Sequence, residues 1–203
     1  MKPKKEAYHP MKENKKYKLR EDDAIVREGR KLYRIQALRD VRYSVKEGKV
    51  GGYVESEANL SHEGTCWLFE NACAYEDARV EGEARMHGHA TLRGKAKLSG
   101  DATLWDHAIV QGEAKVGGGS QLNNQVVVGG SAILKGNVLL YDDVHVGDEA
   151  YLEGDDPKRE LVIQGTTMIH GSTIMQGYGV FPEEGAILEA GSFRVEEEDD
   201  DDD

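Results

Sequence analysis

The chain has few aromatic residues, few prolines and few cysteines. Its 203 residues include three Phe, two Trp and four Pro, and aromatic residues make up 7% of the total. This scarcity argues against a core packed around large rings. The two cysteines, Cys66 and Cys73, are too few for a disulfide framework, so we expect reduced thiols and a cytoplasmic location.

Long apolar runs are missing as well. No run approaches the ~18 residues that a membrane-spanning segment needs, and we therefore expect no membrane partner. The Lys-rich N-terminus lacks the apolar stretch of a secretory signal, which agrees with the expected cytoplasmic location.

Glycine, in contrast, is abundant, with 24 residues. An average protein has ~7% glycine, and this excess with so little proline fits neither collagen nor a Pro-rich linker. It indicates a backbone that repeatedly adopts positive φ, a region that glycine enters without steric cost.

Apolar residues recur every six positions from Leu68 to Val146 without a break. Four positions after each of them stands a small residue or Val, from Ala72 to Ala150. Two positions after each stands Gly, Asn or Asp, the residues that best tolerate the left-handed region, with Glu70 and Glu76 as the exceptions. A period of six does not fit an α-helix. Each hexad therefore predicts a short strand with one large and one small inward side chain, followed by a left-handed corner.

This pattern resembles the hexapeptide repeat of left-handed β-helices, aliphatic-x-x-x-small-x, in which ~18 residues form one triangular coil. The resemblance covers residues 54–192. It implies an all-β, single-stranded solenoid. The left hand of the helix comes from the resemblance alone, because a right-handed helix could have the same period.

The regions outside the regular repeat predict the domain boundaries. We expect a disordered basic N-terminus over 1–16, a β cap over 17–50 and the β-helix over 51–193. A two-residue slip precedes Leu68, and the stretch at 154–160 reads as a loop at a corner, after which the period resumes at Ile163 and continues to Ile187. Residues 194–203 predict a disordered acidic tail. Without its eight acids, Glu196–Asp203, the formal charge of −12 becomes −4, so the folded body is only mildly acidic.

One predicted face differs from the other two. Hexads that start at residues 68, 86, 104, 122 and 140 should stack, and the face they form would carry four of the seven histidines but no Lys or Arg. This composition is typical of an interface, whereas chance clustering on a solvated wall is the alternative. The predicted binding residues are Phe69, His87, His89, Trp105, His107, Ile109, Val127, Tyr141 and His145.

His89 and His107 are eighteen residues apart and should stack in adjacent coils. Imidazoles at such spacing could share a metal ion, and the γ-type carbonic anhydrases, which have this fold, bind zinc through histidines. However, no carboxylate or glutamine set at that family's spacing is evident, so we expect no metal and no resident cofactor.

The segment GGYVESEANLSHEGTCW (51–67), with the cap before it and the hexads after it, resembles a group of uncharacterised bacterial and prophage β-helix proteins. Members of that group are labelled transferases or polymer-forming proteins on repeat content alone. The resemblance implies a non-catalytic binding or structural module that uses the Lys- and Arg-free face for self-association or for binding a host or phage protein. It carries over no catalytic residues.

Two other functions remain open at this point. Many hexapeptide β-helix proteins are CoA-dependent acyltransferases, and His107 or His89 would then be a general base at a subunit interface, with acetyl-CoA as co-substrate. The charge of −12 also permits an acidic mimic of nucleic acid, or a phage inhibitor of a host protein. Direct binding of nucleic acid is not expected, because the chain is acidic.

Overall fold

Each hexad forms a short strand and a tight corner, as the period predicts. The residues two places after the apolar positions all have positive φ from Glu70 to Asp148, and these include the two exceptions, Glu70 (47°) and Glu76 (61°). The backbone amide of Thr91 donates to the Ala108 carbonyl of the next coil over 2.9 Å, and this pattern repeats along the chain. Left-handed corners therefore turn the chain, and pairing with the next coil satisfies its backbone.

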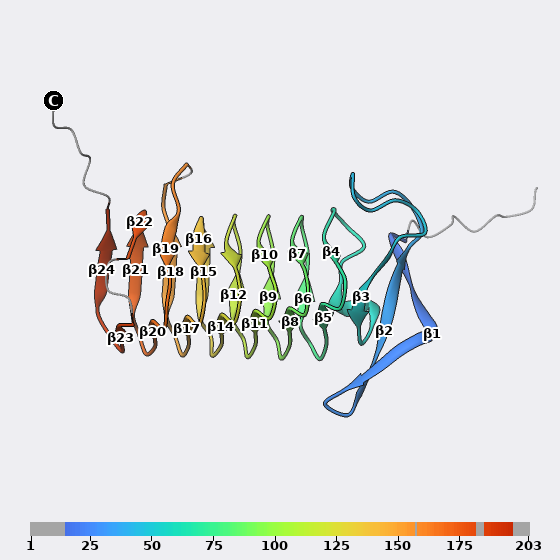
Figure 1. The fold of residues 1–203 in the computed structure, drawn as a ribbon, viewed down its shortest axis with the longest axis horizontal. Coiled ribbons are helices and arrows are strands. Elements are labelled where there is room, and N and C mark those ends of the chain that lie inside the picture. Colours follow the sequence, from blue (N-terminus) through green and yellow to red (C-terminus); the bar gives the residue numbers. More distant parts are fainter. Residues whose placement is uncertain (1–14, 157, 182–184, 197–203) are drawn as a thin grey trace, which may run out of the picture.

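The strands stack into a β-solenoid of about eight turns, in a computed structural model that describes residues 15–156, 158–181 and 185–196 (Figure 1). Successive coils pair in parallel, since Leu104 pairs with Met86 on one side and with Leu122 on the other, eighteen residues away in each direction. The predicted all-β solenoid is confirmed.

The solenoid has three walls, which we number in chain order. Wall 1 contains β1 (Tyr17–Arg27), β2 (Arg30–Ala37), β3 (Val50–Val54), β5 (Cys73–Ala74), β8 (Thr91–Leu92), β11 (Ile109–Val110), β14 (Val127–Val128), β17 (His145–Val146), β20 (Met168–Ile169) and β23 (Ile187–Leu188). Wall 2 contains β4 (Trp67–Leu68), β7 (Arg85–Met86), β10 (Thr103–Leu104), β13 (Gln121–Leu122), β16 (Val138–Leu140), β19 (Leu161–Ile163) and β22 (Gly179–Val180). Wall 3 contains β6 (Arg79–Val80), β9 (Lys97–Leu98), β12 (Lys115–Val116), β15 (Ile133–Gly136), β18 (Tyr151–Gly154), β21 (Ile174–Gly177) and β24 (Ser192–Val195). Among the described residues a single 3-10 turn, η1 (Glu57–Asn59), follows β3 within the first coil.

The core is a narrow tube between the walls. All the apolar positions of the repeat from Leu68 to Val146 are buried, and so are all the small positions from Ala72 to Ala150. Ser120, which stands in a small position, donates its hydroxyl proton to the Gly117 carbonyl oxygen over 2.8 Å. Over the regular repeat from Leu68 to Val146 such a tube has no room for large rings, which explains why the chain contains so few of them.

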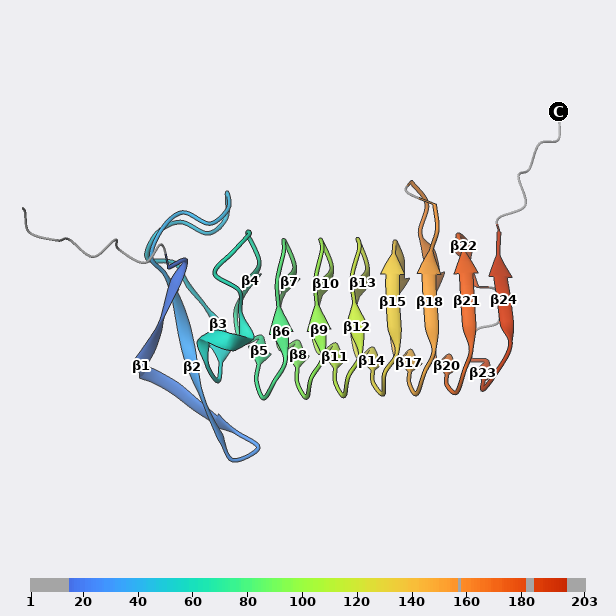
Figure 2. The ribbon, with the colours of Figure 1, turned by 180° about the vertical axis from the view of Figure 1, so that it is seen from behind.

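The two irregular coils lie where the sequence predicts them. In the first coil Val54 pairs with Ala74, twenty residues on, which is the expected two-residue slip. After β18 the chain leaves the wall at Asp155 and Asp156 and returns at β19, and Figure 2 shows the chain projecting from the corner after β18. Beyond it the prediction is wrong at one position: Leu188 is buried, whereas Ile187 is 66% exposed. The register explains the shift, because Ile169 pairs with Leu188, nineteen residues on.

The N-terminal cap closes the first coil. β1 and β2 form an antiparallel hairpin, and β2 pairs with β3, so the cap continues wall 1. Tyr17 fills the end of the tube, with its hydroxyl donating to the Leu60 carbonyl oxygen over 2.8 Å and its ring against Trp67. Cap and solenoid thus share one core.

The predicted boundaries of the terminal segments move by a few residues. Lys16 was expected in a disordered segment, but its side chain is fully buried against Cys66. At the other end β24 continues to Val195, past the expected end of the solenoid at 193. Residues 1–14 and 197–203, which carry most of the predicted basic and acidic tails, lie outside the described residues.

No helix in the described part of the chain is long and apolar enough to cross a membrane.

Candidate functional site

The strip of predicted binding residues does not form one face. The residue that stands five places after an apolar position begins the next strand, around the corner, so it lies on the next wall. Wall 2 and the chain just after its strands carry Phe69, His87, Trp105 and Tyr141, the corners carry His89 and His107, and wall 1 carries Ile109, Val127 and His145. The sequence thus identified three neighbouring surfaces as one.

The expectation of a face without Lys or Arg is wrong for the same reason. Arg85 begins β7 and therefore lies beside His87 on wall 2, although its hexad was assigned to another face. Two more cations, Arg42 and Lys49, reach the same place from the segment between β2 and β3. Wall 2 therefore combines aromatic and cationic groups at the N-terminal end.

Three rings form a continuous stack on this wall. The ring centroids of Phe69 and His87 are 4.3 Å apart with planes 5° from parallel, and those of His87 and Trp105 are 4.0 Å apart with planes 13° from parallel. Each ring comes from a successive coil, so the spacing of paired strands sets the spacing of the stack. The rings therefore face one another along the rod and present their edges on the wall, and Trp105 at the end of the stack is 37% exposed.

This stack forms the floor of an open groove of about 590 Å³, which we call the cationic aromatic groove. It is lined by Arg42, Ser44, Lys49, Phe69, Glu70, Arg85, His87 and Trp105. The segment at 38–49 forms one side of it and is anchored by Val41 and Val45, both buried in the core. The groove is therefore held between the cap and wall 2, close to the arched segment above β4 in Figure 1.

The positive charges of the groove influence one another. Burial lowers the pKa of Arg42, and the neighbouring charge of Arg85 lowers it further. Burial also lowers the pKa of His87, Arg85 and Arg42 add to this effect, and Glu70, with its Oε2 3.7 Å from Nδ1 of His87, opposes it. An anion placed here would relieve the repulsion among the cations.

Arg85 has hydrogen-bonding capacity to spare. One of its terminal nitrogens lies 3.5 Å from the Asp101 carboxylate, but its Nε is buried without a hydrogen-bond partner among the described residues. A buried unpaired N–H is costly, and a bound acceptor would satisfy it. Guanidinium groups bind carboxylates and phosphates through two parallel hydrogen bonds. The groove is therefore suited to an anionic group next to an apolar or flat one.

The paired histidines at the corner have a different geometry. The rings of His89 and His107 stack with centroids 5.2 Å apart and planes 4° from parallel, as their spacing predicts. Both are exposed, and within the described ranges neither ring hydrogen-bonds to a carboxylate that would orient it as a general base. In the same part of the chain, no group of three or more His, Cys, Asp or Glu side chains could hold a metal ion.

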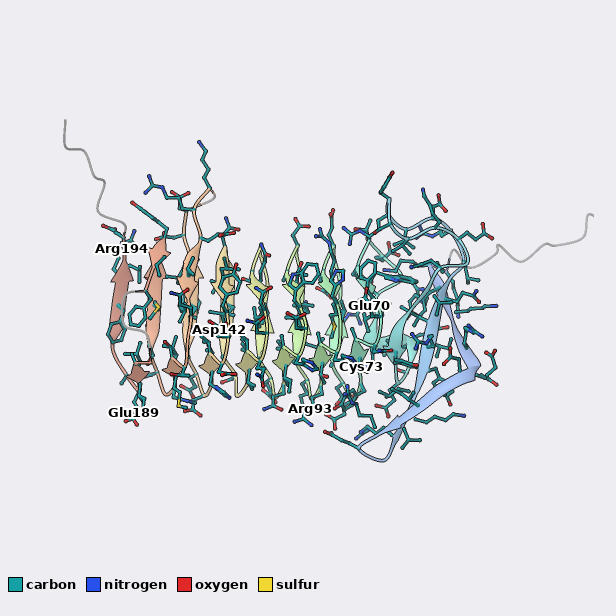
Figure 3. All side chains as sticks on the ribbon, viewed as in Figure 1. Glu70, Cys73, Arg93, Asp142, Glu189 and Arg194 are labelled. Atoms are coloured by element: carbon teal, nitrogen blue, oxygen red, sulfur yellow. The ribbon has the colours of Figure 1, made fainter. Side chains whose placement is uncertain are left out.

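The wall 1 residues belong to a single outward column. It consists of Cys73, Thr91, Ile109, Val127, His145, Met168 and Ile187, each paired with the next. The tip of the β1–β2 hairpin lies over its first members, since Nη1 of Arg27 donates to the Thr91 hydroxyl over 3.1 Å and Glu28 binds Arg93 (Figure 3). Among the described residues, the hairpin therefore covers the N-terminal end of this column.

Sequence reasoning found the rings of the groove but missed its charges. Arg85 could have been found by assigning the fifth position of each hexad to the following strand. Arg42, Ser44 and Lys49 lie in a non-periodic segment, and nothing in the pattern connects them with the stack.

No protein-family model matches the sequence, and no curated protein matches it either.

Proposed function

We propose that the chain is a non-catalytic β-solenoid binding module whose cationic aromatic groove binds a short acidic segment of a protein. The observation that carries this proposal is the three-ring stack next to three cations, one of which has an unpaired buried N–H. The solenoid supplies a rigid wall, which holds the rings in place before the ligand arrives and so lowers the entropic cost of binding.

The groups of the groove have separate roles. Arg85 binds a carboxylate of the ligand, and Lys49, which is exposed at the rim, attracts negative charge from solution. Trp105 and Phe69 contact the aliphatic parts or rings of the ligand. Glu70 limits the number of negative charges that fit beside His87, because it lies 3.7 Å from that ring.

The charge of the whole chain favours a short acidic segment over nucleic acid. Outside the acidic run at 196–203 the formal charge is still −4. A nucleic acid would extend past the groove and meet repulsion along the rest of the surface, whereas a segment of a few residues stays within it.

Tryptophan fluorescence tests the proposal directly. Trp67 is fully buried, so a ligand in the groove should mainly change the emission of Trp105. A six-residue peptide of Asp and Glu with one central Leu should saturate the signal at low salt. Arg85→Ala and Trp105→Ala should each weaken binding by about tenfold or more.

The matched control is Lys95→Ala. Lys95 is an exposed cation that pairs with Glu113 far from the groove, so its loss should leave peptide affinity unchanged. The assigned ligand is wrong if the Arg85 and Trp105 variants bind the peptide as tightly as the wild type does. It is also wrong if a single-stranded oligonucleotide binds the groove more tightly than the peptide does.

A further inference from the structure

Large exposed apolar side chains gather at the two ends of the rod. In the described residues they are Val26, Leu38 and Tyr43 in the cap, Trp105 in the groove, and Met168, Ile174, Val180 and Ile187 in the last two coils. Tyr43 at one end is 96% exposed and Ile187 at the other is 66% exposed. Of these, Met168 and Ile187 are paired neighbours on wall 1, and exposed apolar groups that lie together mark contact surfaces more often than scattered ones do.

The ends also carry opposite charge. The cationic aromatic groove lies at the N-terminal end, beside the cap. The last strand, β24, is followed directly by the acids Glu196–Asp203. Figure 3 shows Glu70 of the groove near the cap and Arg194, just before the acidic run, at the opposite end of the rod.

We propose that copies of this chain associate head to tail, with the acidic run of one copy bound in the cationic aromatic groove of the next. This inference rests on the proposed function, since it names the acidic segment that the groove binds. The cations Arg42, Lys49 and Arg85 meet the carboxylates of the run. The last strands β22, β23 and β24 each end a sheet, so their outer edges face the incoming cap.

The length of the acidic run favours a second copy over the run's own groove. Eight residues span at most ~28 Å when fully extended. From β22 to β10, the strand before Trp105, there are four strand spacings of ~4.8 Å, and the run starts on wall 3 and must also cross to wall 2. Only its last residues would reach Trp105, and Lys49 would remain out of reach. A neighbouring copy can place the whole run in the groove.

Such a contact joins two different surfaces, so it can repeat. Each open assembly keeps a free groove at one end and a free acidic run at the other, so it can grow into a longer chain or close into a ring rather than stop at a two-fold symmetric dimer. Because much of the attraction is between exposed charges, the association should weaken as salt screens it.

The test is sedimentation velocity of the full-length chain from micromolar to millimolar concentration, in low salt and in about 0.5 M salt. We expect the average mass to rise with concentration in low salt and to fall back toward the monomer in high salt. Two full-length variants separate the partners: one with every acid from Glu196 to Asp203 changed to Ser, and one with Lys49→Glu and Arg85→Glu. Each alone should stay monomeric, with an unchanged circular dichroism spectrum.

Mixing the two variants provides the sharpest result. One has a groove without a binding run and the other a run without a groove, so together they should form heterodimers and nothing larger. Assembly of either variant alone, monomers of the wild type at all concentrations, or a mixture that stays monomeric would each overturn the proposal. If the Leu-containing acidic peptide binds the groove while the chain stays monomeric, the proposed function stands and only this inference fails. If neither binds, both fail.

Discussion

The side-chain nitrogen of Lys16 lies 3.1 Å from Sγ of Cys66 and 2.9 Å from the Cys66 carbonyl oxygen, and both residues are fully buried. This contact joins the start of the described part of the cap to the first coil of the solenoid. Burial lowers the pKa of Lys16, although the neighbouring thiol opposes the effect. The cap is therefore closed by a buried cation whose desolvation lowers the free energy of unfolding.

That cost depends on pH in a way that can be measured. With a folded-state pKa below the ordinary 10.5, Lys16 carries its full penalty at low pH, and the penalty disappears as both states lose the proton near 10.5. The free energy of unfolding of the wild type should therefore rise relative to that of Lys16→Met as the pH approaches 10.5 from below. Urea unfolding of both proteins at several pH values measures these free energies. A difference between the two free energies of unfolding that does not change with pH would contradict the prediction.

His87 should titrate below its ordinary pKa of 6.5, because it is partly buried in the ring stack. Glu70→Gln removes the group that opposes this shift and should lower the pKa further, whereas Arg85→Ala should raise it. NMR titration of the imidazole signals measures all three proteins. Since the folded pKa is depressed, the stability that depends on neutral His87 is complete above 6.5 and is lost as the pH falls toward the folded-state value. Titration of His87 at or above 6.5 would show that the stack is open to water.

Gly118 tests the left-handed corners. Its φ is +67°, and a Cβ on this residue would lie 2.5 Å from the Gly136 carbonyl oxygen of the next coil. Gly118→Ala should lower the free energy of unfolding by about 2 kcal/mol or more, since it adds strain in φ and a clash with backbone. Gly117→Ala is the matched control, because the only close atom is the Ser99 hydroxyl oxygen at 3.2 Å, and its effect should stay within about 0.5 kcal/mol. Denaturant unfolding compares the two, and equal losses would contradict the assigned corner.

Leu104 tests the core ladder. It is fully buried between Met86 and Leu122 in the adjacent coils. Leu104→Ala leaves a cavity in a narrow tube whose walls cannot collapse, and it should cost about 3 kcal/mol. Lys95→Ala, at an exposed corner, should leave the unfolding curve unchanged. Thermal and urea unfolding measure both. A Leu104 variant as stable as the wild type would mean that the ladder is loosely packed.

The repeat determined the fold because the residues of each hexad by themselves encode a short strand and a corner. Inward side chains at two positions and a corner residue that tolerates positive φ are local properties, and they repeat in the sequence as they do in the structure. Even the interruptions, before Leu68 and at 154–160, could be located, because a break in phase is as visible as the phase itself.

The candidate site could be predicted only in part. Phe69, His87 and Trp105 follow the period, so their stacking could be expected from the spacing alone. Assigning Arg85 to the wrong wall removed a charge from the site, since its place at the fifth position of its hexad puts it past the corner, at the start of the next strand.

What the sequence determined by itself is therefore the solenoid, its corners and its inward ladders, because these depend on contacts between residues at a fixed separation along the chain. Only the tertiary structure decided that Arg42 and Lys49 meet Arg85 and the ring stack. The segment at 38–49 has no period, and its position is set by burial of Val41 and Val45 against the first coil, a long-range contact that no local pattern encodes.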